Sequence, residues 1–202
     1  MATIDDSADF SGTAMPQAKA PLLPHWEVVN TSEIYSNGFF RLRRDSCSLQ
    51  LQPEVTSQHY VLEMPDAVVV VPVTETGLLV MVEQYRHGAA GQFLEFPGGQ
   101  IDAGDASLET AARRELNEET GYDVSSLRYL GAHYPNPGAQ TNRIHTYLAT
   151  VVVHGAGPLP DQFENLRVVL LSRDELARRI REGVEVASST LAALSLLSVQ
   201  AE

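Results

Sequence analysis

Three glutamates lie within five residues of one another near the end of the stretch GGQIDAGDASLETAARRELNEETGY, residues 98–122. They are Glu115, Glu118 and Glu119. On a helix this spacing places all three carboxylates on one side of a single turn, where like charges repel. The stretch contains no lysine that could neutralise them, so we expect a cation beside them. Mg²⁺ takes oxygen ligands and is usually held by one or two carboxylates together with substrate phosphates.

The spacing of the apolar residues predicts that these glutamates belong to an amphipathic helix. Its core-facing stripe would consist of Leu108, Ala111, Ala112 and Leu116. Asp105 or Ser107 would cap the start of the helix, and Gly121 would end it. The glycines before the helix allow a close backbone approach, so the carbonyl of Gly98 could join the metal ligands. Arg114 could orient a neighbouring carboxylate with its planar guanidinium.

The same stretch resembles the Nudix box, whose pattern is Gly, five residues, Glu, seven residues, Arg-Glu-apolar-any-Glu-Glu-any-Gly-apolar. The matching residues are Gly99, Arg114, Glu115, Leu116, Glu118, Glu119, Gly121 and Tyr122. The chain departs from the pattern at the first glutamate, because Asp105 stands there, with eight residues before Arg114. The resemblance implies Mg²⁺-dependent (or Mn²⁺-dependent) hydrolysis of a nucleoside diphosphate derivative. It assigns catalysis to Arg114, Glu115, Glu118 and Glu119, and the metal to Gly98 and these glutamates.

Length and composition fit a single soluble domain with an appended segment: the chain has 202 residues and a net charge of −12. This charge argues against a nucleic-acid partner, which needs a basic surface, but not against a phosphate substrate, since a bound metal inverts the local charge. Cys47 is the single cysteine, so we expect no intramolecular disulfide. No apolar run is long enough to span a membrane and no secretory signal is recognisable. We therefore expect a cytoplasmic protein.

The remaining pattern predicts an N-terminal arm (1–24), an N-terminal β segment (25–64) and a hydrolase domain (65–202). In the β segment, Asn37 and Gly38 indicate a hairpin turn, and Pro53 should end a strand before the next one at 57–64. Further strands are expected at 66–73, 78–86, 92–96, 126–134, 143–153 and 166–172. Helices are expected at 174–182 and at 188–199, the latter capped by Ser188 or Ser189. This pattern is typical of a mixed α/β or an α+β layer fold, which the resemblance sharpens to a Nudix α/β/α sandwich with a mixed sheet.

Two runs, VVVVPVTETGLLVMVEQYRHG and LEFPGGQIDAGD, resemble the branch of the family that hydrolyses ADP-ribose and nucleotide sugars. This resemblance implies a homodimer that exchanges its N-terminal sheets. It also implies that Arg86 and Glu95 contact the substrate and that Trp26 stacks on the base. The alternatives are a surface arginine, a half-exposed strand residue, and a tryptophan that packs internally or in a dimer contact.

The loop at 135–143 contains no carboxylate, although the corresponding loop of ADP-ribose hydrolases supplies a glutamate that orients water. The candidates for the general base are therefore a helix carboxylate, Glu164, His133 and His145. This difference favours a broader nucleotide-sugar substrate. The expected reaction is hydrolysis of the diphosphate in ADP-ribose or a nucleoside diphosphate sugar, giving a nucleoside monophosphate and a sugar phosphate. The alternatives are a nucleotide-sensing module without turnover and a hydrolase of another nucleoside polyphosphate.

Overall fold

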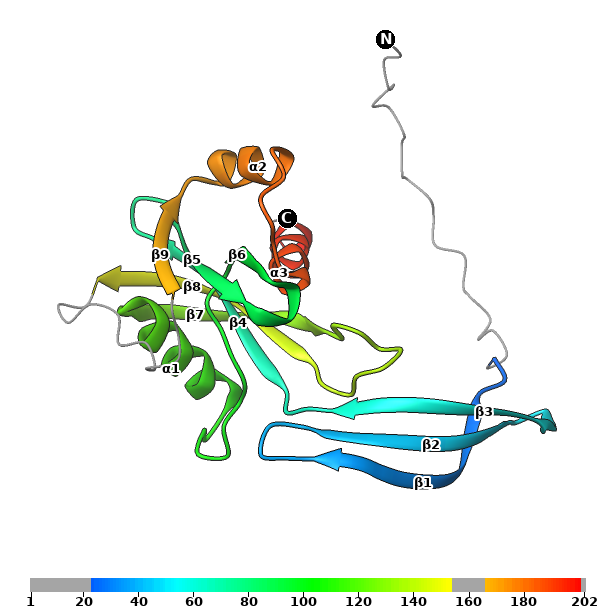
Figure 1. Ribbon diagram of the computed structural model, residues 1–202. Helices are drawn as coiled ribbons and strands as arrows, with labels where there is room; N and C mark the ends of the chain where they lie inside the picture. Colours follow the sequence, from blue (N-terminus) through cyan, green and yellow to red (C-terminus); the bar gives the residue numbers. More distant parts are fainter. Residues whose placement is uncertain (1–22, 154–165, 201–202) are drawn as a thin grey trace, which may run out of the picture.

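A computed structural model of the chain describes residues 23–153 and 166–200 (Figure 1). Most of the predicted N-terminal arm, and Glu164, lie outside the described residues. The described chain forms two sheets and three α-helices. Within it, no helix is both long and apolar enough to cross a bilayer.

The N-terminal strands form a separate antiparallel sheet, called sheet A, in the order β1–β2–β3. These strands are β1 (Trp26–Ser36), β2 (Arg41–Leu49) and β3 (Gln52–Glu63). The predicted hairpin turn is confirmed: Asn37 Oδ1 accepts hydrogen bonds from the N–H groups of Phe39 (2.8 Å) and Phe40 (2.9 Å). The prediction for Pro53 was wrong, because this proline lies inside β3. β3 is at the edge of sheet A, where the missing N–H of a proline breaks no ladder hydrogen bond.

The second sheet, called sheet B, is mixed and has the order β6–β5–β4–β8–β7, with β9 also paired to β5. Its strands are β4 (Ala67–Thr74), β5 (Leu79–Arg86), β6 (Gly91–Glu95), β7 (Tyr122–His133), β8 (Ile144–Val153) and β9 (Leu166–Leu171), and the short helix η1 (His87–Ala89) joins β5 to β6. β4 runs parallel to β8, whereas the other pairs are antiparallel. As predicted from its β-branched run, β4 is buried on both faces.

Different helices cover the two faces of sheet B. On one face lies α1 (Leu108–Thr120), which packs in a cluster made of Ala111, Ala112, Leu116, Val68, Val70 and Val80. On the other face lie α2 (Arg173–Arg181) and α3 (Ser188–Val199), in a cluster that includes Leu176, Ala193, Leu197, Val69, Val71, Leu79 and Met81. Neighbouring residues of β4 and β5 thus point to opposite faces. The predicted α/β/α sandwich with a mixed sheet is confirmed.

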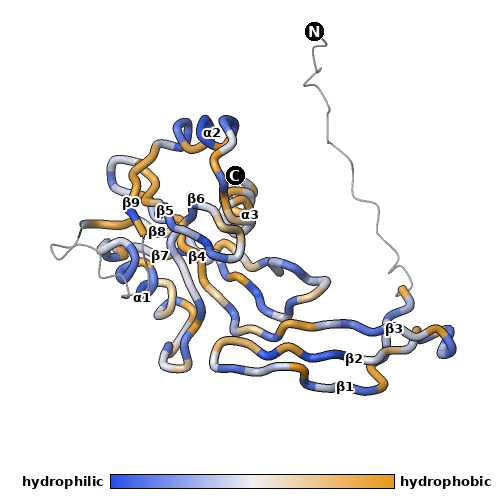
Figure 2. Tube along the Cα trace, viewed as in Figure 1, coloured by the Kyte–Doolittle hydropathy of each residue, from blue (hydrophilic) through white to orange (hydrophobic). Residues whose placement is uncertain are grey.

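The two C-terminal helices differ in how they are built. α2 is hydrophilic along most of its length and buries only Leu176, whereas α3 is largely hydrophobic (Figure 2). Ser172 caps α2 by accepting a hydrogen bond from the N–H of Glu175 (3.1 Å). The predicted serine cap of α3 was wrong: Ala187 occupies the N-cap position and supplies no side-chain hydrogen bond. Burial of its apolar side therefore does more to hold α3 than a local cap does.

Candidate active site

The local sequence of α1 sets the direction of its carboxylates. Ser107 caps the helix by accepting a hydrogen bond from the N–H of Thr110 (3.1 Å), and Gly121 ends it with a left-handed φ of 71°. Because the predicted apolar stripe packs on sheet B, the polar side turns toward the glycine loop that precedes the helix. Glu115 and Glu119 are only 8% and 3% exposed, while Glu118 remains more open to solvent. Burial of two carboxylates is costly unless partners compensate their charge.

The glycine loop lies directly against β4 and α1. The N–H of Val68 donates to the carbonyl of Gly99 (2.9 Å), so the loop follows β4 closely. A Cβ on Gly98 would lie 2.2 Å from the Val68 carbonyl oxygen, and one on Gly99 would lie 2.6 Å from a carboxylate oxygen of Glu115. The N–H of Gly98 donates to Glu119 Oε2 (2.9 Å). Both glycines are therefore needed for the loop to approach the carboxylates.

Arg114 is the centre of the ion pairs in this region. Its guanidinium donates to Glu115 (2.8 Å), Glu118 (3.0 Å) and both oxygens of Asp105 (2.8 and 3.2 Å). The hydrogen bond with Asp105 is the main reason that the pKa of Arg114 is raised, and the bond from Arg114 likewise lowers the pKa of Asp105. Asp105 therefore faces the same cluster as the other acids of the box, despite the longer spacing to Arg114.

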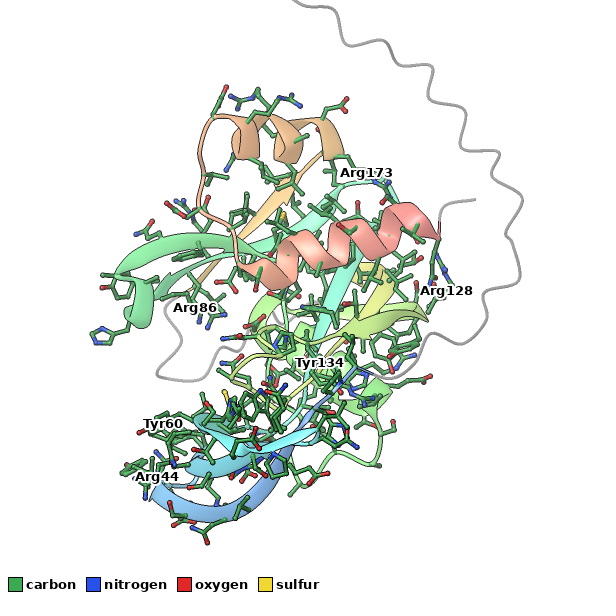
Figure 3. All side chains as sticks on the ribbon, turned by 90° about the vertical axis from the view of Figure 1, so that its right-hand side faces the viewer. Arg44, Tyr60, Arg86, Arg128, Tyr134 and Arg173 are labelled. Carbon is green, nitrogen blue, oxygen red and sulfur yellow. The ribbon has the colours of Figure 1, made fainter. Side chains whose placement is uncertain are left out.

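The Arg86 side chain, at the turn end of the β5–β6 hairpin, reaches back to Glu95 at the far end of β6. Arg86 Nε and Nη2 donate to the two oxygens of Glu95, each at 2.8 Å, which is the bidentate geometry favoured for arginine and carboxylate. Glu95 is almost fully buried, whereas the Arg86 side chain is about half exposed (Figure 3). A buried carboxylate thus fixes the direction of an accessible guanidinium.

Trp26 does not lie near these residues within one chain. It is opposite Leu49 at one end of sheet A, whereas Arg41 and Glu63 pair at the end that leads into sheet B. The eight steps along β2 from Arg41 to Leu49, at about 3.3 Å each, separate the two ends by roughly 26 Å. Trp26 is 39% exposed and stands beside His59, with ring centroids 5.2 Å apart.

The candidate bases outside α1 have different environments. Both ring nitrogens of His133 are buried without a hydrogen-bond partner, and burial lowers the pKa of this histidine. His145 hydrogen-bonds to Tyr129 (3.1 Å) and Asp66 (3.4 Å), so its ring is held in a structural network. The sequence analysis did not predict that Asn142, in the β7–β8 connection, is buried with an unpartnered Oδ1. A polar residue just before an alternating strand is a weak signal, and nothing in its spacing indicates burial.

The donor set of the box suits a hard divalent cation. It consists of carboxylates and backbone carbonyls, and the Glu115 carboxylate packs so closely on Gly99 that a Cβ there would overlap it. Among the described residues, no three His, Cys, Asp or Glu side chains converge in metal-binding geometry. The carboxylates are turned instead toward Arg114 and the N–H of Gly98. Binding of a cation would thus require Glu115, Glu118 and Glu119 to exchange part of these hydrogen bonds for metal coordination.

Comparison with known proteins agrees with this geometry. Residues 63–193 match the NUDIX domain family. The chain is 32% identical over 177 residues to a methanol dehydrogenase activator from Bacillus methanolicus, a match covering 86% of this chain and 93% of that protein. It is 37% identical over 93 residues to an ADP-ribose pyrophosphatase from Bacillus subtilis (strain 168), covering 46% of this chain and 50% of that protein. The crystal structure of an ADP compounds hydrolase has a similar fold, with a TM-score of 0.73 and 22% identity over 90% of this chain and 95% of that chain.

Proposed function

This chain belongs to the Nudix family and is a Nudix pyrophosphohydrolase, and from that premise we propose that it hydrolyses the diphosphate linkage of ADP-ribose or of a nucleoside diphosphate sugar. Its similarity to an ADP-ribose pyrophosphatase supports this substrate class. The products are a nucleoside monophosphate and a sugar phosphate. We further propose that Mg²⁺, or Mn²⁺ in its place, is the cofactor and that the protein works in the cytoplasm.

The observation that carries this proposal is the burial of Glu115 and Glu119 against the glycine loop. Arg114 pairs with Asp105, Glu115 and Glu118, so a single guanidinium is shared by several carboxylates of the loop and helix. Carboxylate oxygens close to backbone carbonyls are the ligands that a hard divalent cation prefers, and the bound cation would in turn attract a diphosphate.

Each residue of the site has a role in the proposed reaction. Glu115, Glu118, Glu119 and the carbonyl of Gly98 would hold the cation, which when bound supplies charge neutralisation at the diphosphate and makes water more acidic. Arg114 positions Glu115 and Glu118, and the N–H of Gly98 positions Glu119. Water adds to one phosphorus, the bond from that phosphorus to the bridging oxygen breaks, and the other phosphate leaves with the bridging oxygen. Positioning and charge stabilisation are sufficient for this chemistry, so no covalent intermediate is needed.

Arg86 is proposed to bind a phosphate oxygen of the substrate. Glu95 fixes the guanidinium through two hydrogen bonds of 2.8 Å, so the group loses little rotamer freedom when a phosphate arrives. Exchange of Arg86 for lysine would keep the charge but remove the bidentate pair with Glu95. We expect this variant to show a higher KM for the diphosphate substrate, because Glu95 would no longer hold the positively charged side chain in a fixed direction.

We also propose that the protein is a homodimer in which sheet A of one subunit packs on its partner. Sheet A exposes many large apolar side chains, among them Val28, Val29, Tyr35, Val55 and Tyr60. A single-layer sheet with this much exposed apolar surface indicates a partner. Exchange would also allow Trp26, which is remote from its own site, to approach the site of the partner subunit. Sedimentation velocity of the chain and of Val29→Lys tests this: the variant should shift to the monomer, and a wild-type monomer contradicts the proposal.

A substrate screen tests the proposed reaction directly. The chain is incubated with ADP-ribose, nucleotide sugars, NADH and nucleoside triphosphates, each with Mg²⁺, with Mn²⁺ or with a chelator, and the monophosphate products are measured. Activity on ADP-ribose or nucleotide sugars that the chelator removes is expected. Calorimetric titration with Mg²⁺ accompanies the screen. An absence of Mg²⁺ and Mn²⁺ uptake, or metal-independent turnover, would contradict the assignment.

A second candidate function is the activation of a dehydrogenase. It is favoured by the match to a methanol dehydrogenase activator, which extends over 86% of this chain and 93% of that protein. The two functions are compatible, because a dinucleotide cofactor contains the same type of diphosphate linkage as ADP-ribose. Methanol dehydrogenase activity measured with and without this chain separates activation from hydrolysis alone.

A further inference from the structure

An apolar cavity lies between α2 and α3, on the face of sheet B opposite α1. Its volume is about 160 Å³, and its apolar wall includes Leu79, Leu176, Ala177, Leu194 and Leu197. Leu79 points to this face of β5, whereas its neighbour Val80 packs on the α1 side. The cavity is therefore separated by the sheet from the carboxylates of the candidate active site.

α2 is attached to the sheet by a buried leucine and by ion pairs. Arg179 bridges Glu83 of β5 (3.4 Å) and Glu175 (3.0 Å), and Leu176 is the residue that α2 buries. Ala177 is next to Leu176 and has a side chain of one carbon, so it leaves the space in front of α3 unfilled. The lining atoms of an apolar void lack van der Waals partners on one side. An apolar occupant of suitable size would supply these contacts.

The volume is suited to a small ring or a short branched chain. An engineered cavity of about 150 Å³, lined by Leu, Ile and Phe, stays dry and binds benzene. The present cavity has a comparable volume and a largely apolar lining, but it is partly open to solvent. Its apolar wall offers few polar partners to a water molecule, so an apolar ligand can displace water from it.

An arginine side chain forms part of the wall of this cavity. Arg173, the first residue of α2, lines it together with Ser198 near the end of α3, and lies between the two helices (Figure 3). Arg178 and Arg179 both pair with Glu175, whereas Arg173 forms no ion pair with any residue in the described part of the chain. An apolar cavity with an exposed guanidinium beside it complements a ligand that has an apolar body and one negative charge.

We propose that this cavity binds a small amphipathic monoanion, such as an aromatic or branched aliphatic carboxylate. The apolar body occupies the space in front of Ala177, and the carboxylate pairs with Arg173. This site is distinct from the α1 site, so binding requires neither a divalent cation nor a nucleotide.

Fluorine NMR of 4-fluorobenzoate, with the full-length protein and a chelator present, tests the proposal. For a ligand of about ten non-hydrogen atoms we expect a Kd in the region of about 1 mM. Ala177→Leu fills the cavity and should abolish binding. Ala177→Val is the milder second variant, and its binding should be weaker than that of the wild type. Circular dichroism confirms that each variant is folded.

The charge is tested separately with Arg173→Gln. This variant should bind 4-fluorobenzoate about three- to fivefold more weakly, as expected for a partly exposed ion pair, and should bind neutral 4-fluorobenzyl alcohol as well as the wild type does. Arg181→Gln is the matched control, because it removes an arginine of α2 that does not line the cavity.

Three results would overturn the proposal. The first is an absence of 4-fluorobenzoate binding to the wild-type protein. The second is binding that folded Ala177→Leu leaves unchanged. The third is a change of sedimentation coefficient in Ala177→Leu without any benzoate binding to the wild type, which would make the cavity a contact between copies of the chain.

Discussion

Two regions of this molecule hold arginines and carboxylates together, and they differ in charge balance. In the box cluster, Arg114 pairs with Asp105, Glu115 and Glu118, and Glu119 lies beside the same loop. In the sheet A cluster, Arg41 and Arg43 pair with Glu33, Asp45 and Glu63. In the first cluster one arginine, Arg114, forms ion pairs with four acids (Asp102, Asp105, Glu115 and Glu118), whereas in the second two arginines share three acids.

We propose that this difference separates a functional site from a structural network. In the sheet A cluster, Asp45 also accepts a hydrogen bond from Thr31 (2.8 Å), so its buried carboxylate is satisfied by the protein alone. In the box cluster, Glu115 and Glu119 are buried against the glycine loop, with Glu115 in contact with Gly99 and Glu119 accepting a hydrogen bond from the N–H of Gly98. The sharing of one arginine among several acids and the close backbone approach together distinguish the box cluster, while a buried ion pair alone does not indicate a function.

The largest expected difference between the clusters is in catalysis. Glu119→Gln should lower hydrolysis of the diphosphate substrate by roughly a hundredfold or more, because several kcal/mol of charge stabilisation at the diphosphate would be lost. Glu63→Gln in sheet A is the matched control and should change the rate less than about threefold. Steady-state release of the monophosphate product measures both. Equal rates for Glu119→Gln and the wild type would remove the distinction between the two clusters.

The next effect concerns stability and its response to metal. Arg114→Ala should lower the free energy of unfolding by about 2–3 kcal/mol, since it leaves Asp105 and Glu115 without their cation. Mg²⁺ should restore part of this loss, because a second cation then neutralises the same acids.

Arg43→Ala provides the comparison, because it unpairs Asp45 in a cluster where we expect no metal. Its loss of stability should be similar in size but independent of Mg²⁺. Urea denaturation with and without Mg²⁺ measures both variants. A Mg²⁺ response of equal size in the two variants would show that the ratio of arginines to acids does not distinguish the clusters.

A substitution in α1 that removes no charge should lower stability by an amount that does not depend on the metal. Ser107→Ala removes the N-cap of α1 and should cost about 1 kcal/mol of stability. Ser172→Ala removes the corresponding cap of α2 and should cost a similar amount. Neither loss should depend on Mg²⁺ in thermal denaturation, and a metal-dependent loss in Ser107→Ala would couple the cap to the site.

The smallest effect is confined to acid pH. The hydrogen bond from Arg114 lowers the pKa of Asp105 below its ordinary value of 3.8 in the folded state, so this carboxylate stabilises the fold above that value. The contribution is lost as the pH falls below 3.8 through the lower folded-state pKa. Asp105→Asn should therefore weaken the dependence of the melting temperature on pH below about 4. An unchanged acid dependence would mean that the pair with Arg114 contributes nothing to folding.

Asp45 gives the corresponding test in sheet A. Burial opposes ionisation of this carboxyl, but hydrogen bonds from Thr31 and Arg43 prevail and lower its pKa. The sign of its pH dependence is therefore the same as for Asp105. Asp45→Asn should weaken the dependence of the melting temperature on pH below about 4 to a similar degree. Mg²⁺ should not change this result.

Local features of the sequence were sufficient for most elements. The apolar stripe of α1, the Asn37 turn and the β-branched run of β4 each fix structure through neighbours along the chain. Predictions failed where tertiary placement prevailed: Pro53 is tolerated because β3 is an edge strand, and α3 needs no side-chain cap because its apolar side is buried. The burial of Asn142 was not predicted because burial of a single polar residue has no local signature.

By itself the sequence determined the box helix, its acids and the family, because these depend on residue type and spacing within the contiguous stretch 98–122. The tertiary structure decided which groups meet: Asp105 with Arg114, Glu119 with the N–H of Gly98, and Arg86 with Glu95. It also placed Trp26 at the far end of sheet A and left a cavity beneath α2. These pairings depend on how the β5–β6 hairpin, the glycine loop and α1 fold against one another, which the spacing of residue types along the chain does not fix.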